Sequence, residues 1–445
     1  MSTLVIAEHD NNSLKVSTLN AVAAEMEAWA AENAMVISAP KSSVSLFTPW
    51  TKQVNVQLDV KLGDDVIPTV KFLRLLGVTF DPLHTFSHHA ASVARRASSR
   101  LNIMRALSDT TFGKDKKCLL MTYKCFVRSL IDYCAAVVYP TYSPASIEKL
   151  QKVQNKALRL ATGCHIAASV DHVHAEAQEL PVKDHLHLLS SQYLARSLQP
   201  DHVSFPHAQI GQGPRNLKHT LRSKCIGDVQ PYLEADGSLG RGNFGYVLNR
   251  LHTDVVRKVV HNSNPNRVLG TRPPPISASE RKLPRKSRTT LAQLRSGHCA
   301  QLRDFQLRLG KINDETCPDC ELFPQNVKHL FECPAKPTTL SVTDLWDNPV
   351  EVVDHLRSSP TFTHLPPIAS PPRRHQRPRP PAAPPDSPFF TPISLPPSPP
   401  LSPVFTPLSL PPSQPPRLPN LMSLPIRRPL SSTGSSSSQR GVNLP

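Results

Sequence analysis

The distribution of proline divides this chain into two parts that cannot share one core. Of its 47 prolines, 26 lie at or after Pro360, within the last 86 of the 445 residues. Proline fixes φ and has no backbone N–H to donate, so such a segment forms neither a continuous helix nor a sheet. Runs such as PPSPPLSP, together with the serine repeat near the end, bury too little apolar surface to offset chain entropy. Residues 359–445 are therefore predicted to be a disordered Pro/Ser-rich tail.

Charge and hydropathy limit the classes of function. The formal charge is +17, of which the tail contributes +7, so residues 1–359 carry +10 on their own. A basic folded part favours a polyanionic partner such as RNA or DNA. No run of about 18 apolar residues is present and the N-terminus lacks a signal-peptide pattern, which predicts neither a membrane span nor secretion. The nine cysteines are odd in number, and this favours a reducing intracellular compartment, nuclear and/or cytoplasmic.

Hydrophobic periodicity predicts an α+β fold that is mainly α. Strand-like apolar runs are confined to the first 80 residues, and helical periodicity takes over after them. Residues 200–288 show little periodicity beyond one short helix. The expected helices span 14–34, 86–107, 114–137, 144–162, 180–198 and about 245–260; the expected strands span 44–47, 54–60, 66–70 and 76–80.

The strongest chemical signal is a set of four metal ligands near the C-terminal end of the folded part. Cys317 and Cys320 form a Cys-Pro-Asp-Cys knuckle, and His329 and Cys333 follow about one helical turn apart. Three thiolates and one imidazole are a tetrahedral donor set for Zn²⁺. Four protein ligands leave no open position, so the predicted zinc is structural and stabilises a segment with little core of its own.

Two glycine-containing motifs suggest enzymes but lack the residues that such enzymes need. Residues 240–247 (GRGNFGYV) match the glycine-rich loop of protein kinases, yet no catalytic-loop or Asp-Phe-Gly sequence is present, so a flexible turn before a helix is the favoured interpretation. Gly63-Asp64-Asp65 resembles a metal-binding polymerase turn, but only Asp10 and Asp59 precede it. An ordinary hairpin turn is favoured.

Three further patterns leave alternatives open. The histidines at 172, 174, 185 and 187 either bind a metal or, as is commoner in amphipathic helices, cap a helix end or sit at a half-exposed surface. The basic run over 281–288 is a solvated linker, a nuclear import signal or a set of phosphate contacts, which would use Arg285, Lys286 and Arg288. In the tail, PSQPPR at 412–417 fits a ligand of SH3-type domains, although such patterns arise freely in Pro-rich sequence.

Several separate phrases resemble one family. NAMVISAPKSSVSLFTP and LGVTFDPLHTFSHH are similar to the end of the palm in reverse transcriptases of jockey-type non-LTR retrotransposons. RRASSRLNIMRAL, LLMTYKCFVRSLIDYCAAVVYP, IEKLQKVQNKALRLATGCH and the segment around LRSGHCAQLRDFQLRLG resemble the thumb and C-terminal zinc region. The likeness runs, in the family's order, from about residue 3 to 353.

The resemblance implies an organisation for the chain. The family's catalytic Tyr-Ala-Asp-Asp turn would lie just before residue 3, so its Mg²⁺-binding carboxylates are expected to be missing here. Lys41 then matches a motif-D lysine near the incoming nucleotide, and Leu76, Gly77 and Val78 match a primer-grip hairpin. The implied parts are a palm remainder (1–83), a helical thumb (84–200), an irregular connector (201–287), a helix and zinc region (288–358) and the tail (359–445).

The functional expectation follows from both lines of reasoning. In the intact family, target-primed RNA-directed DNA synthesis uses Mg²⁺, whereas this chain alone is expected to be an inactive, truncated reverse transcriptase that keeps nucleic-acid-binding parts. The alternative is a non-catalytic nucleic-acid-binding or adaptor protein that uses the thumb, the zinc knuckle and the tail. Template–primer duplex, element RNA or target DNA would bind through salt-sensitive contacts to the phosphates. Beyond the basic run, the candidate contacts are Arg95, Arg96, Arg100, Arg105 and Arg295.

Overall fold

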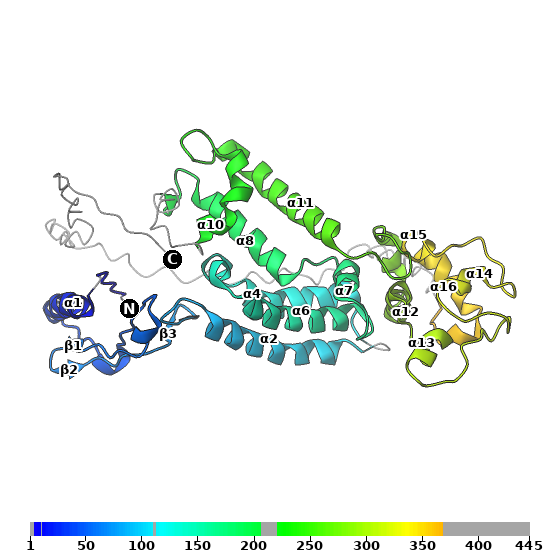
Figure 1. Ribbon diagram of the computed structural model, residues 1–445, viewed down its shortest axis with the longest axis horizontal. Helices are drawn as coiled ribbons and strands as arrows, with labels where there is room; N and C mark the ends of the chain where they lie inside the picture. Colours follow the sequence, from blue (N-terminus) through cyan, green and yellow to red (C-terminus); the bar gives the residue numbers. More distant parts are fainter. Residues whose placement is uncertain (1–3, 10, 110–112, 206–219, 368–445) are drawn as a thin grey trace, which may run out of the picture. The chain divides into compact units, whose positions relative to one another are not determined.

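The computed structural model describes residues 4–9, 11–109, 113–205 and 220–367, whose regular structure is mostly helical (Figure 1). In these residues the strands form two small antiparallel sheets of two strands each, both before residue 81. A mainly helical fold with small sheets is thereby confirmed. Most of the predicted tail, from residue 368 onwards, lies outside the described residues. No described helix is both long enough and apolar enough to cross a membrane.

The N-terminal segment folds around one helix and a short hairpin. Helix α1 (Asn12–Glu32) begins at Asn11, whose side chain accepts a hydrogen bond from the Ser13 N–H group. Strands β1 (Lys61–Leu62) and β2 (Asp65–Val66) pair across Gly63, which has a φ of 57° that suits glycine. Leu62 of β1 packs with Ala23 of α1 and with residues before and after the strands in a small core of Ala23, Ala39, Val44, Leu46, Leu58, Val60, Leu62 and Ile67.

The strand predicted over 54–60 is wrong. No ladder forms there, because the Thr69 side chain occupies the place of a partner strand. Its hydroxyl accepts a hydrogen bond from the Leu58 N–H group at 3.0 Å and donates one to the Leu58 carbonyl at 3.3 Å. The predicted strand over 44–47 is reduced to a single bridge between Val44 and Thr69. Hydrogen bonds from a side chain thus take the place of the predicted strand pairing.

A second hairpin joins the N-terminal segment to the helices that follow. Strands β3 (Leu73–Leu75) and β4 (Val78–Phe80) are connected by Leu76 and Gly77, both with positive φ, as a two-residue hairpin turn requires. The Tyr133 hydroxyl donates a hydrogen bond to the Leu76 carbonyl at 2.6 Å. The turn is therefore held by a residue 57 positions away in the chain.

Long helices follow the second hairpin, and most begin and end within a few residues of the predicted bounds. Helix α2 packs along α6, with Ala90 and Ala97 on its buried face where small side chains allow close approach. Helix α6 begins at the cap Ser143 and ends at Gly163, with φ 78°. The helix bounds are α2 Ser87–Leu107, α6 Pro144–Thr162, α7 Val170–Ala177 and α8 Val182–Ser197.

The single helix predicted over 114–137 is broken into pieces. One turn with π geometry, Tyr123–Arg128, lies in its middle, and Cys134 adopts a left-handed conformation with φ 56°. The π turn brings Tyr123 and Val127 into the core together, and both are fully buried. Tertiary packing therefore overrides the simple helical repeat here. The pieces are α3 Lys116–Thr122, the π turn, α4 Ser129–Asp132 and α5 Ala135–Val138.

The segment predicted to be irregular contains more helix than its periodicity indicates. Helix α10 (Leu221–Val229), which has no counterpart in the prediction, and helix α11 (Phe244–Asn262) both pack against α8. Gly240 and the short turn after it lead directly into α11, so the kinase-like motif is a turn before a helix and not a loop between strands. The shared core consists of Leu188, Leu194, Ala195, Leu198, Cys225, Val229, Leu239, Val247 and Leu251.

The C-terminal helices share one core with residues that precede them. Its members include Trp346, which is 2% exposed, and in sequence they run from Val268 to Leu365. The metal-ligand segment packs on this core through Val327, Leu330 and Phe331. The helices are α12 Arg285–Ser296, α13 Arg303–Arg308, α14 His329–Glu332, α15 Asp344–Asp347 and α16 Pro349–Arg357.

Candidate metal centre and nucleic-acid interface

A tight loop presents the first two candidate metal ligands. The Cys317 N–H group donates to the Phe323 carbonyl at 2.8 Å, and the Glu321 N–H group donates to the Cys317 carbonyl at 2.9 Å. A bridge between Thr316 and Pro324 closes the loop at its base. Glu321 has a φ of 53°, a conformation that favours glycine, and this turn brings Cys317 and Cys320 together.

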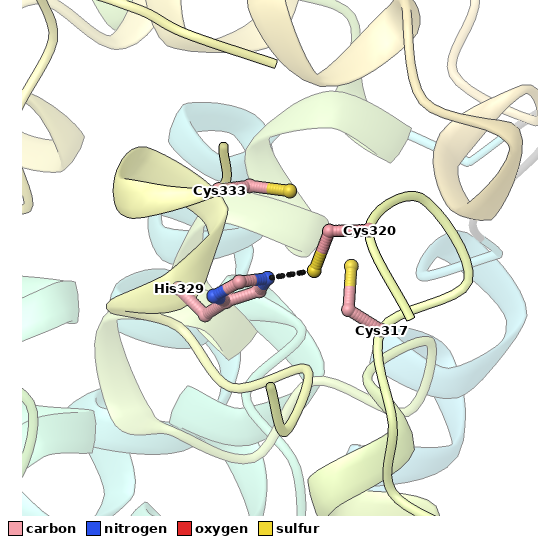
Figure 2. Close-up of side chains that lie close together, drawn as sticks. All are labelled: Cys317, Cys320, His329 and Cys333. Atoms are coloured by element: carbon pink, nitrogen blue, oxygen red, sulfur yellow. Dashed lines mark hydrogen bonds between the residues drawn. The ribbon is translucent and has the colours of Figure 1, made fainter. Parts of the chain in front are cut away.

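The other two ligands come from a short helix. The Asn326 side chain accepts a hydrogen bond from the His329 N–H group at the start of α14. The His329 imidazole points towards the loop, and Cys333 follows directly after the helix. Figure 2 shows the four side chains converging. Their ligand atoms lie within 4.8 Å of one another, and Cys320 Sγ is 3.3 Å from His329 Nε2. The convergence predicted from the spacing is thus present.

The donor set fits zinc. Zn–S bonds of about 2.3 Å and Zn–N bonds of about 2.0 Å in a tetrahedron place ligand atoms roughly 3.6–3.8 Å apart, close to the observed grouping. Three sulfurs and one nitrogen would complete the coordination and leave no position for a substrate. The metal would therefore be structural, and it would hold the loop of Cys317 and Cys320 against α14.

The thiols differ in how easily they ionise without a metal. Burial raises the pKa of Cys333 to about 11, and the neighbouring thiols of Cys320 and Cys317 act in the same direction. Burial also opposes ionisation of Cys320, but its pKa is lowered overall because N–H groups of Leu322 and Phe323 stabilise the thiolate. Since a metal binds thiolates, zinc binding at neutral pH would displace protons from this cluster.

A carboxylate within the loop ties it to the rest of the C-terminal region. Asp319 forms an ion pair with Lys336 at 3.0 Å and accepts a hydrogen bond from the Ser359 hydroxyl at 3.0 Å. The His355 ring nitrogen Nε2 lies 3.1 Å from the Leu330 carbonyl of α14. Polar contacts therefore hold both the loop and α14 of the candidate metal segment against residues that follow them in the chain.

The basic residues predicted on α2 are exposed. Arg95, Arg96, Arg100 and Arg105 all face solvent, and the 21-residue helix contains no acidic residue. Arg100 donates to the Phe126 carbonyl at 2.9 Å and Arg105 donates to the Asn102 side chain. Among the described residues none of the four forms an ion pair. The helix therefore presents four exposed cations around its solvent side, and we call this set of arginines the α2 arginine face.

The arginines of α12 occupy different positions from those predicted. Arg285 donates to the carbonyls of Leu160 and Ala161 at the end of α6 and to those of Ser108 and Asp109 after α2. It thereby satisfies the C-terminal carbonyls of two helices. Lys286 is half-buried. The prediction of phosphate contacts at Arg285 is not supported by this position, because its donors already have backbone partners.

Arg295 is fully buried, which is incompatible with a surface contact to nucleic acid. Its guanidinium pairs with both oxygens of Glu176, at 3.1 and 3.2 Å, and with Glu280, and it donates to the Leu345 carbonyl. Arg288 is 9% exposed and approaches Glu280 at 3.5 Å. These two arginines are structural. The sequence could not reveal this, because Glu176 lies 119 positions from Arg295.

The remaining candidate residues lie in the N-terminal segment and form no metal site among the described residues. Lys41 is exposed at the end of a short 3₁₀ turn, Ala39–Lys41. In the predicted primer-grip hairpin, Leu76 is 82% exposed at the tip and Val78 is buried. Gly63-Asp64-Asp65 forms an ordinary hairpin turn, and the described residues group no carboxylates around it as a metal site.

The four helical histidines do not converge, and each has its own partner. His172 contacts the Ala292 carbonyl, His174 contacts the Glu179 carbonyl, and His185 approaches Asp132 at 3.1 Å. His187 forms an ion pair with Asp228 at 2.6 Å. A metal site is therefore not supported: His172, His185 and His187 are half-exposed, as the alternative predicted, whereas His174 is buried.

The His187–Asp228 pair predicts a pH-dependent contribution to stability. Hydrogen bonds to Asp228 and Cys225 raise the pKa of His187 to about 9. Because the folded-state pKa lies above the unfolded value, this stabilisation is full below pH 6.5 and is lost as the pH rises through 9. Asp228→Asn should cost about 1 kcal/mol at pH 6, a modest figure because Asp228 is partly exposed, and little at pH 9.5. Urea unfolding at both values checks this; an equal cost at both would contradict it.

Comparisons with known proteins add no relative. No protein-family model, no curated protein and no solved structure matches the chain.

Proposed function

We propose that the chain is a nucleic-acid-binding protein whose α2 arginine face grips the phosphate backbone of a duplex. Four exposed arginines on one helix, with no acidic residue on that helix and no ion pair among the described residues, support this proposal most directly. Such contacts are independent of base sequence and release counterions on binding. The neighbouring helix α6 adds Lys152 and Lys156, both exposed, and its one acidic residue, Glu148, pairs with Lys152.

From the resemblance to jockey-type reverse transcriptases, we propose that the ligand is a template–primer duplex of RNA and DNA. In that setting the helices after β4 act as a thumb and the zinc-binding segment engages element RNA or target DNA. The 445 residues contain no Tyr-Ala-Asp-Asp sequence, so we propose that this chain alone does not polymerise. Primer extension on a poly(A) template with Mg²⁺ should show no incorporation; reproducible incorporation would contradict the proposal.

Replacing Arg95 and Arg96 together with alanine should weaken binding of a random-sequence RNA–DNA duplex. Two lost phosphate contacts would reduce the slope of log K against log salt by about 1.8. The matched control is Arg257→Ala with Lys258→Ala, an adjacent and exposed basic pair on α11. Fluorescence anisotropy over a salt series measures both variants. If the two double variants weakened duplex binding equally, only the overall charge of the protein would matter, and α2 would not be the binding site.

A further inference from the structure

A hollow of about 380 Å³ lies between the β3–β4 hairpin region and the start of α2, away from the metal ligands. Its wall combines an aromatic ring, an imidazole and two lysines. Phe72 and His88 stack with ring centroids 4.3 Å apart and planes 18° apart. Its lining also includes Asp81, Pro82, Leu83, Ser87 and Val54.

The cations of this hollow are not neutralised by carboxylates. Lys149 forms no ion pair among the described residues, and Lys71 has only a 3.4 Å contact to the Asn55 side-chain oxygen. The one acidic residue in the wall, Asp81, is 7% exposed and accepts hydrogen bonds from the backbone of Thr85 and Phe86. The two lysines therefore remain available to an anionic ligand.

The aromatic pair remains open to solvent. Phe72 is 44% exposed even with His88 stacked on it. An exposed ring beside unpaired lysines is the combination with which proteins hold unpaired nucleotides, because a base stacks on the ring while phosphates meet the cations. A base-paired duplex hides its base faces and could use only the lysines.

We propose that this hollow binds single-stranded nucleic acid, with an unpaired base stacked on Phe72 and the adjacent phosphates held by Lys71 and Lys149. The site is separate from the α2 arginine face, although both rest on the proposed role in nucleic-acid binding. It would accept the unpaired end that continues from a duplex. Its recognition is by base stacking and charge, so little sequence preference is expected.

The test uses the full chain with two fluorescein-labelled probes, a 12-nucleotide oligouridine and a 12-base-pair duplex. Phe72→Ala should weaken oligouridine binding about tenfold or more and duplex binding less than twofold, and Phe72→Tyr should restore the first. Tyr246→Ala, which removes an exposed ring on α11, is the matched control. Thermal melting monitored by circular dichroism confirms that each variant is folded.

The lysine variants separate the ligand sources and the two proposals. Lys71→Ala with Lys149→Ala should reduce the salt slope for oligouridine by about 1.4. Competition by uridine monophosphate at concentrations similar to those of oligouridine would assign the site to free nucleotides and overturn the single-strand proposal. The single-strand proposal would also be overturned if Phe72→Ala bound oligouridine with wild-type affinity, or if it lost affinity for oligouridine and duplex equally. If the α2 variants leave duplex binding unchanged while Phe72→Ala still weakens oligouridine, the proposed function fails and this site stands.

Discussion

Replacing Cys317 with serine is expected to abolish zinc binding and to unfold the loop and helix α14 that the metal joins. The four ligand atoms lie within 4.8 Å of one another, and Glu321, directly after Cys320, adopts a glycine-like conformation. Apparent zinc affinities of such sites correspond to about 10–16 kcal/mol in isolated fingers, so losing one thiolate should destabilise the C-terminal region by several kcal/mol. Elemental analysis and thermal melting measure the two effects.

The control for this variant is Cys118→Ser, because Cys118 is exposed on α3 and lies outside the cluster. It should retain one zinc per chain and the wild-type melting temperature. A strong chelator added to the wild type should reproduce the effect of Cys317→Ser. Equal zinc content in both serine variants, or no zinc in the wild type, would contradict the assignment.

Replacing Arg295 with alanine is expected to cost about 3–5 kcal/mol of unfolding free energy, because it removes a buried cation that pairs with the buried carboxylates of both Glu176 and Glu280. The guanidinium is fully buried and also lies 5.9 Å from the centre of the Trp346 ring. Arg257→Ala, which breaks an exposed pair with Asp254, should cost less than about 1 kcal/mol. Urea unfolding of both variants gives the comparison, and a cost at Arg295 similar to that at Arg257 would contradict the account.

The buried group of Arg295, Glu176 and Glu280 also predicts how the stability of the chain changes at acidic pH. Burial alone would raise the pKa of Glu176, but Lys116 and Arg295 lower it to about 2. Because the folded-state pKa lies below the unfolded value, this stabilisation is present above pH 4.5 and is lost as the pH falls towards 2. Arg295→Ala should therefore begin to unfold at a higher pH than the wild type.

Local patterns predicted much of the helical structure and all four residues of the candidate metal cluster. Ser143 and Gly163 cap the two ends of α6, and such caps can be recognised in the sequence. The spacing of Cys317, Cys320, His329 and Cys333 was likewise sufficient to predict that the four side chains converge. The break at Cys134 and the π turn could not be read in this way, since they depend on which side chains the core must bury.

The roles of the arginines show the same limit. The sequence of a basic run is the same whether its side chains contact solvent, backbone carbonyls or buried carboxylates. Arg285 binds carbonyls more than 120 positions away, and the partners of Arg295 lie on three separate segments. Only the tertiary structure distinguishes these two arginines, whose donors have partners within the protein, from Arg95 and Arg96, which are exposed. Of the arginines predicted to contact nucleic acid, only the four on α2 are exposed.

The most direct test of the account is the salt dependence with which the full chain binds a random-sequence RNA–DNA duplex. Fluorescence anisotropy between 50 and 300 mM KCl gives the affinity at each concentration. Four arginine–phosphate contacts predict a linear fall of log K with log salt and a slope of about −3.6. Absence of binding at 50 mM KCl, or an affinity that does not change with salt, would contradict the claim that the α2 arginine face grips a nucleic-acid backbone.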